Sequence, residues 1–171
     1  PSLYPQDIAD RARARWLEEY ADTRLADGLI WKLFYQHSIR RRVFGEEADA
    51  AVVTHALEVD IPAALDYLER QLPEDGFIFG AFSIADLGLA CYVRTAAFVR
   101  YEIDAVRWPR CAALVAKVLA LPFMQKLAQF EDGARRVPMA EQRAALLAIG
   151  APLSRETLGT SAPRPVLPRA S

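Results

Sequence analysis

The sequence predicts an all-α bundle of about five to six helices. Apolar residues recur at three- and four-residue steps, as they do between Leu57 and Leu72, and a capped helix start stands near the middle of the chain. No stretch has the alternating pattern typical of a strand. A hydrophobic fraction of 53% over 171 residues is enough for one packed domain. We therefore expect a single helical domain over residues 7–150.

The capped start introduces a strongly apolar helix. Ser83 and Asp86 have the spacing of a capping box, in which each side chain accepts a hydrogen bond from the other residue's backbone N–H. Phe82 and Leu87 stand at the two positions of a hydrophobic staple. Because almost no charge follows before Arg94, we expect this helix at the centre of the fold. No histidine lies near the Ser–carboxylate pair in sequence, so it is interpreted as a cap rather than as a nucleophile.

The first helix is expected to run from Asp7, as N-cap, to about Arg42, and Gly45 ends it. Its weakest point is the Asp27–Gly28 pair, where helix propensity is low and a break is expected.

A second helix is expected from the acidic residues at 46–49, which favour the positive end of a helix dipole, to Leu72. Pro62 should bend it, since its ring removes one hydrogen bond. Later helices are expected over 83–101 and 104–121, from Pro122, and from Pro138 to about Ile149. Residues 1–6 read as a linker. Residues 151–171, rich in Pro, Ser and Thr, read as an extended or disordered tail.

Composition argues against several partners. With 21 basic and 22 acidic residues the net charge is −1, which gives no bulk attraction to nucleic acid or to an anionic membrane. No run reaches the 18 apolar residues of a membrane span, and the first residues lack the features of a signal peptide. Cys91 and Cys111 lie in apolar helical surroundings and are interpreted as free thiols of a cytoplasmic protein.

The usual catalytic motifs are missing from the sequence. His37 and His55 share no metal-binding spacing with the two cysteines, so no metal site is expected. There is neither a phosphate-binding GxxxxGK[ST] loop nor a Gly-x-Ser-x-Gly elbow. The triplet Arg40-Arg41-Arg42 stands in the last turn of the first helix, where cations offset the dipole, and is interpreted as a solvated helix end.

Four motifs, in order, resemble the C-terminal helical domain of glutathione transferases. These are the helix start Asp10–Tyr20, the Gly-x-x-Ser-Ile-Ala-Asp box at 80–86, Trp108-Pro109-Arg110, and Leu121-Pro122-Phe123. The resemblance covers roughly residues 5 to 131.

The resemblance implies a function shared between two domains. In this family a separate N-terminal thioredoxin-like domain binds glutathione and supplies the residue that activates its thiol. Residues 1–6 would then be a linker remnant from such a domain, and no catalytic residue is expected in this chain. The resemblance further implies a cytoplasmic homodimeric detoxification enzyme that conjugates glutathione to small apolar electrophiles.

The resemblance also implies site residues. The wall for the electrophilic co-substrate falls on Ala26, Leu29, Ile30 and Leu33. A contact to the glutathione amino group across the dimer falls on Glu18 or Glu19, because a carboxylate would pair with an ammonium. Core packing of the first helix would produce a similar apolar pattern. A non-catalytic protein-interaction module of the same fold therefore stays open as an alternative.

Overall fold

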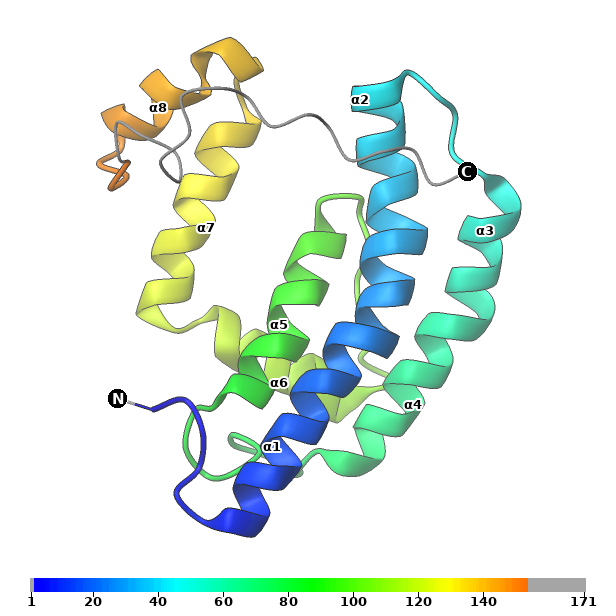
Figure 1. Ribbon diagram of the computed structural model, residues 1–171, viewed down its shortest axis with the longest axis vertical. Coiled ribbons are helices and arrows are strands. Elements are labelled where there is room, and N and C mark those ends of the chain that lie inside the picture. The colour runs from blue at the N-terminus through cyan, green and yellow to red at the C-terminus, as the bar shows by residue number, and fades with distance from the viewer. Residues whose placement is uncertain (1, 154–171) are drawn as a thin grey trace. The chain divides into compact units, whose positions relative to one another are not determined.

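The computed structural model describes residues 2–153, which form helices joined by loops (Figure 1). The chain divides into two compact units, residues 1–121 and 122–171. Within the described residues no strand occurs, and the nearest approach to one is an isolated bridge between Phe79 and Ala81. The all-α prediction is thus confirmed. Most of the expected tail, residues 154–171, lies outside the described residues.

The first helix runs without a loop from Ile8 to Phe44. It consists of α1 (Ile8–Tyr20), η1 (Ala21–Leu25), η2 (Asp27–Arg40) and α2 (Arg41–Phe44), where η1 and η2 have the wider π-type winding. The carboxylate of Asp7 accepts the N–H of Asp10 at 2.9 Å, which confirms the expected N-cap. Gly45 ends the helix with φ +68°, a left-handed conformation that glycine adopts without strain.

The expected break at Asp27–Gly28 is wrong, and the reason is the packing of Gly28. This glycine is buried, and a Cβ placed on it would lie 2.7 Å from Cγ1 of Ile61 on the second helix. The missing side chain lets the two helices approach each other closely. Tertiary packing therefore outweighs the low propensity of glycine.

The second helix runs from Ala50 to Gln71. It is built from α3 (Ala50–His55), η3 (Ala56–Asp60) and α4 (Ile61–Gln71), and the Asp49 carboxylate caps its start. The chain stays helical through Pro62, which stands in the first turn of α4, directly after the π-type turn η3. A proline costs least at that position because its missing N–H would have no partner within α4.

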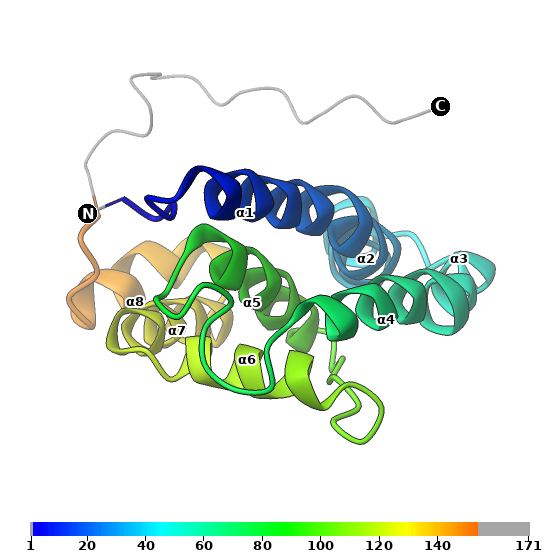
Figure 2. The same ribbon diagram turned by 90° about the horizontal axis from the view of Figure 1, so that it is seen from below.

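The helix α5 (Ile84–Ala97) lies between the first helix and α6, as Figure 2 shows, and forms the centre of unit 1. Its buried apolar residues include Leu89, Ala90, Val93 and Ala96. It ends before the expected residue 101 because Arg100 takes φ +67° and the N–H of Tyr101 returns to the carbonyl of Ala96 at 3.2 Å.

The predicted capping box forms at the start of α5. Asp86 is fully buried, and its carboxylate accepts from the N–H and the hydroxyl of Ser83, at 2.8 and 2.7 Å, and from the N–H of Ile78, at 2.9 Å. The carbonyl of Leu3 accepts the N–H of Ile84 at 3.0 Å. The cap thus joins the loop before α5 and the N-terminal segment to the central helix. Phe82 meets Phe77 edge-on, with ring centroids 5.7 Å apart; its staple contact with Leu87 stays a prediction.

The helix α6 (Pro109–Leu119) begins later than the expected residue 104, because α4 holds its start. The two oxygens of Glu69 accept the N–H groups of Arg110 and Cys111 at 2.9 and 3.0 Å. The indole N–H of Trp108 donates to Asp66 at 2.6 Å. The Trp-Pro motif therefore stands where the start of α6 binds two carboxylates of α4, those of Asp66 and Glu69.

The second unit holds α7 (Pro122–Arg135), the 3₁₀ turn η4 (Met139–Glu141) and α8 (Gln142–Ala148). Its two helices meet closely, since a Cβ on Gly133 would lie 2.8 Å from Cδ1 of Ile149. The helix starts expected at Pro122 and near Pro138 are confirmed.

Among the described residues no single helix has the length and apolar character needed to cross a membrane. Only α6 and α7 counted together, across the break between them, reach both.

We predict opposite effects for two glycine-to-alanine changes. Gly28→Ala gains about 1 kcal/mol of helix propensity but forces a Cβ into Ile61, an overpacking cost of about 1–3 kcal/mol. We expect a net loss of about 1 kcal/mol in the free energy of unfolding, measured by urea titration.

Gly88→Ala is the matched control. A Cβ at Gly88 would lie 3.5 Å from that of Ala21, an ordinary contact, so this variant should gain up to about 1 kcal/mol. Equal effects at the two positions would contradict the close approach at Gly28.

We predict that Asp86→Ala destabilises unit 1 by about 2–4 kcal/mol, more than an exposed cap, because buried donors lose their acceptor. Asp7→Ala, which removes an exposed cap, should cost about 1 kcal/mol in the same urea titration. A loss for Asp86→Ala no larger than that for Asp7→Ala would show that the buried carboxylate has no special role.

Candidate functional site

The two glutamates expected to contact glutathione differ in their surroundings. The hydroxyl of Tyr4 donates to Oε2 of Glu18, and the Arg15 guanidinium lies 5.4 Å from the centre of the Tyr4 ring. The hydrogen bond to Glu18 is the main cause that raises the pKa of Tyr4. Glu18 is half-buried, whereas Glu19 is exposed. Glu18 is therefore the more fixed of the two carboxylates.

A second tyrosine–carboxylate pair lies one turn further along the first helix. The hydroxyl of Tyr92, on α5, donates to Oδ1 of Asp22 at 2.6 Å. Burial, and then this hydrogen bond, raise the pKa of Tyr92 well above its usual value. Glu18 adds to this shift, so both carboxylates act on one phenol. Nothing in the sequence joins Asp22 and Tyr92, which are 70 residues apart, and sequence reasoning missed the pair.

The four residues expected to line the co-substrate pocket lie on the first helix, and most of them are buried. Ala26, Leu29 and Leu33 are buried, with at most 5% of their surface exposed, and Ile30 is half-buried. The cavities of about 360 and 180 Å³ described below are lined by other residues. Their role as a co-substrate wall stays a prediction, and the burial of three of them fits core packing.

A cleft of about 180 Å³ opens between the first and second helices. Its lining residues are Tyr20, Arg24, Asp27, Val59, Asp60, Ala63 and Ala64.

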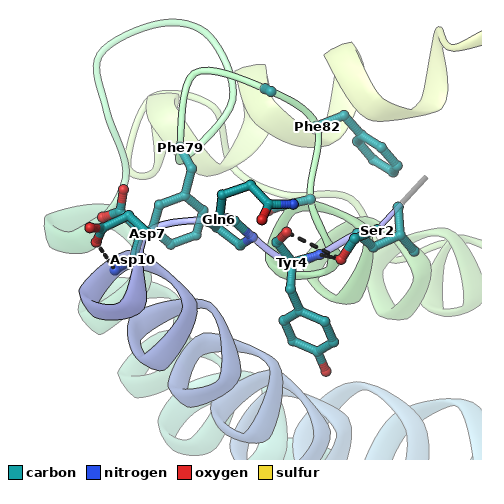
Figure 3. Close-up of a pocket in the computed structure, with 11 residues that line it drawn as sticks. Ser2, Tyr4, Gln6, Asp7, Asp10, Phe79 and Phe82 are labelled. Atoms are coloured by element: carbon teal, nitrogen blue, oxygen red, sulfur yellow. Dashed lines mark hydrogen bonds between the residues drawn. The ribbon is translucent and has the colours of Figure 1, made fainter.

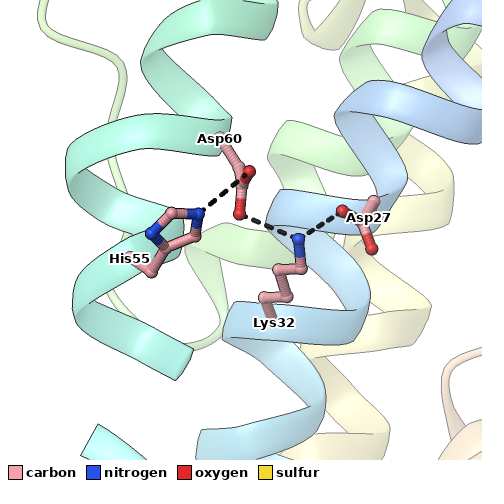
Figure 4. A network of polar contacts seen from close by, with 4 residues as sticks. All are labelled: Asp27, Lys32, His55 and Asp60. Atoms are coloured by element: carbon pink, nitrogen blue, oxygen red, sulfur yellow. Dashed lines mark hydrogen bonds and ion pairs between the residues drawn. The ribbon is translucent and has the colours of Figure 1, made fainter. Parts of the chain in front are cut away.

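A polar network borders this cleft (Figure 4). Lys32 bridges Asp27 and Asp60, with N–O distances of 2.6 and 2.8 Å, and His55 lies 3.7 Å from Asp60. Hydrogen bonds to the two carboxylates raise the pKa of Lys32. The network joins the first and second helices near the contact between Gly28 and Ile61. Its role is therefore structural.

A larger cavity, of about 360 Å³, lies between the N-terminal segment and the loop before α5 (Figure 3). Tyr4, Phe79 and Phe82 give it aromatic walls, and Asp7 and Asp10 stand at the start of α1 on one side. Tyr4 links this cavity to Glu18. Glu18 itself is not among the residues that line the cavity.

The described residues hold no group of three or more side chains that could bind a metal ion. Cys111 is buried, and burial, with Glu69 beside it, raises the pKa of its thiol, which makes it unreactive. Arg40 bonds Glu46 and Gln36 and so holds the turn after the first helix. The anion-binding alternative for the arginine triplet gains no support from Arg40.

Comparison with known proteins identifies the fold. Residues 39–117 match the family model described as "Glutathione S-transferase, C-terminal domain". The structure is similar to that of a glutathione S-transferase from Methylobacillus flagellatus KT with GSH bound, with a TM-score of 0.54 and 23% identity. That match covers 72% of this chain and 59% of the other, so the chain spans less than two thirds of its neighbour. No curated protein sequence matches the chain.

These two matches confirm the resemblance seen in the sequence. The helical bundle has the fold of a glutathione transferase C-terminal domain, and the family model extends from the end of the first helix through most of α6. The matched region includes two of the four motifs, the capping box at residues 83–86 and the Trp-Pro motif at residues 108–109.

We predict that the pair of Tyr92 and Asp22 makes stability depend on alkaline pH. The pKa of Tyr92 is higher in the folded state than in the unfolded state. The stability that this tyrosine contributes is therefore fully present below about pH 10, the usual tyrosine pKa. It is lost as the pH rises toward the folded-state pKa. Tyr92→Phe should cost about 1 kcal/mol at pH 8, and this difference should shrink by pH 11, as measured by urea titration. Asp22→Asn should also make the free energy of unfolding depend less on pH above about pH 10, because the carboxylate that raises the pKa of Tyr92 is removed. Parallel pH profiles for wild type and Tyr92→Phe would contradict the assignment.

Proposed function

We propose that this chain is the helical, co-substrate-binding half of a glutathione transferase. The family match over residues 39–117 carries the proposal, and the fold shared with a glutathione-bound transferase supports it. The reaction is attack of the glutathione thiolate on a small apolar electrophile, as in cellular detoxification. Cys111, a buried cysteine that forms no disulfide, supports a reducing, cytoplasmic location.

The chemistry is divided between two domains in this proposal. A thioredoxin-like domain outside this sequence binds glutathione and stabilises its thiolate by donating a hydrogen bond to the sulfur. The helical half shapes the apolar side of the pocket and excludes water. Of the four proposed wall residues, Ile30 has accessible surface; Ala26, Leu29 and Leu33 hold the helix that carries it. The chain alone should therefore have little turnover.

Glu18 is the proposed contact to the glutathione ammonium. Its Oε2 is held by Tyr4, which fixes the carboxylate and leaves Oε1 to accept from a ligand. The neighbouring cavity of about 360 Å³ gives space on that side of the first helix. Glu19 is exposed and less constrained, so it serves as the comparison residue.

The proposed assembly is a homodimer, and one face of unit 1 supports it. Trp16 is 55% exposed, donates to the hydroxyl of Tyr67 at 2.8 Å, and stands beside Tyr20. Arg24 and Asp27 line the adjoining cleft. Such a face can pair with itself about a two-fold axis, because cation and carboxylate exchange partners between two copies.

The alternative function is a non-catalytic interaction module of the same fold. The burial of Ala26, Leu29 and Leu33 favours it, because a module needs no apolar cleft at these positions.

The deciding experiment is the intact mass of the native polypeptide from its source cell, followed by retention on immobilised glutathione. We expect a mass larger than 19.1 kDa by on the order of 80 residues, a native mass of two copies, retention, and turnover with 1-chloro-2,4-dinitrobenzene. A native polypeptide of 19.1 kDa that is not retained would contradict the transferase proposal and favour the module.

Two matched variants of the native-length protein test the contact residue. Glu18→Gln should raise KM for glutathione by about tenfold with little change in kcat, since a charge-assisted hydrogen bond is lost. Glu19→Gln should leave KM unchanged. Tyr4→Phe keeps the Glu18 carboxylate but removes the hydroxyl that donates to it. A small change in KM for this variant would show that the effect of Glu18→Gln comes from lost glutathione binding and not from lost internal structure. An effect at Glu19 alone would reassign the contact.

A further inference from the structure

The cavity of about 360 Å³ between the N-terminal segment and the loop before α5 has a lining of its own. The four proposed wall residues do not line it, and neither do Glu18 and Glu19. Its volume lies within the range of about 300–1,000 Å³ that is typical of small-molecule sites. The class of ligand that it suits follows from the side chains around it.

Three aromatic side chains line the cavity. Tyr4, Phe79 and Phe82 are all half-buried. Two of these rings already attract a cation from α1. The guanidinium of Arg13 lies 5.8 Å from the centre of the Phe79 ring, and that of Arg15 lies 5.4 Å from the centre of the Tyr4 ring. The walls therefore suit a ligand that presents an aromatic ring, a cation or both.

The charged side chains in the lining are acidic, and no basic side chain is among the described residues that line it. Asp7 and Asp10 stand at one end of the cavity and Phe82 at the other in the view of Figure 3. Asp7 caps α1, whereas the Asp10 carboxylate has no partner among the described residues. The start of α1 favours negative charge at this position. Asp10 is thus a carboxylate that can pair with a cation.

We propose that this cavity binds a small organic cation that carries an aromatic ring, of the arylalkylamine class. The ammonium donates to the Asp10 carboxylate, with the amide oxygen of Gln6 as a second acceptor, and the ring packs against Phe79. A metal ion fits less well, because the described residues hold no group of three or more metal-binding side chains and aromatic walls supply no oxygen ligands.

The test compares two ligands that share an indole ring and differ in charge, tryptamine and indole-3-propionate. Each is titrated into the native-length protein at neutral pH by isothermal titration calorimetry. We expect tryptamine to bind at least about tenfold more tightly, because it alone can form a charge-assisted hydrogen bond with Asp10. Raised salt should weaken its binding, since Asp10 is exposed. Equal affinities, or no binding of tryptamine, would overturn the proposal.

Three variants locate the site. Asp10→Asn keeps the cap of α1, to which Asp10 contributes only its backbone N–H, and should weaken tryptamine binding about tenfold. Phe79→Leu keeps an apolar side chain without the ring and should weaken it about three- to tenfold. Glu58→Gln is the matched control, at an exposed carboxylate outside the lining, and should change nothing. With folding verified by circular dichroism, unchanged affinity in Asp10→Asn or Phe79→Leu would contradict the site.

Glutathione separates this site from the transferase site. It carries an ammonium but no aromatic ring, so an excess of glutathione should leave the affinity for tryptamine unchanged. Displacement of tryptamine by glutathione would assign the cavity to the glutathione site and would overturn the proposal. The proposal does not rest on the transferase function, and its failure would leave the tests of Glu18 and of turnover unaffected.

Discussion

The buried carboxylate of Asp86 is the interaction on which the arrangement of unit 1 depends. It is fully buried and accepts three hydrogen bonds, two from Ser83 and one from Ile78. A buried carboxylate is costly unless its lone pairs are satisfied. Those bonds therefore fix the loop before α5 as well as the helix start. Because α5 contacts both the first helix and α6, an error in its entry angle would displace both of these neighbours.

At two helix starts in unit 1, a partner distant in sequence accepts hydrogen bonds from free backbone N–H groups. Glu69 of α4 caps α6, and the carbonyl of Leu3 reaches α5. Such caps form only when the bundle is assembled, so secondary and tertiary structure are coupled. One consequence concerns function. The hydrogen bond from Ile84 to Leu3 fixes the N-terminal segment at the start of α5. Tyr4 lies in that segment and holds the Glu18 carboxylate, so the same helix start positions the proposed contact residue.

Local rules predicted much of this fold and little of its site. The N-cap at Asp7, the end at Gly45 and the box at Ser83 and Asp86 involve residues at most a few positions apart, so their spacing alone reveals them. The contact of Gly28 with Ile61 spans 33 positions, so the low helix propensity of Gly28 predicts a break that the packing of the two helices prevents. The pair of Tyr92 and Asp22 is equally non-local. Likewise the apolar pattern of the first helix could not distinguish a pocket wall from a core face, because both need the same residue types.

Native-state hydrogen exchange of the backbone amides of Ser83 and Ile78 tests the central role of Asp86 most directly. If the carboxylate organises the unit, both amides exchange only through global unfolding, with the same denaturant dependence as the amides of Leu89 and Leu29 in the core helices. Exchange of Ser83 and Ile78 by a local opening, with little dependence on denaturant while the core amides stay protected, would contradict the account.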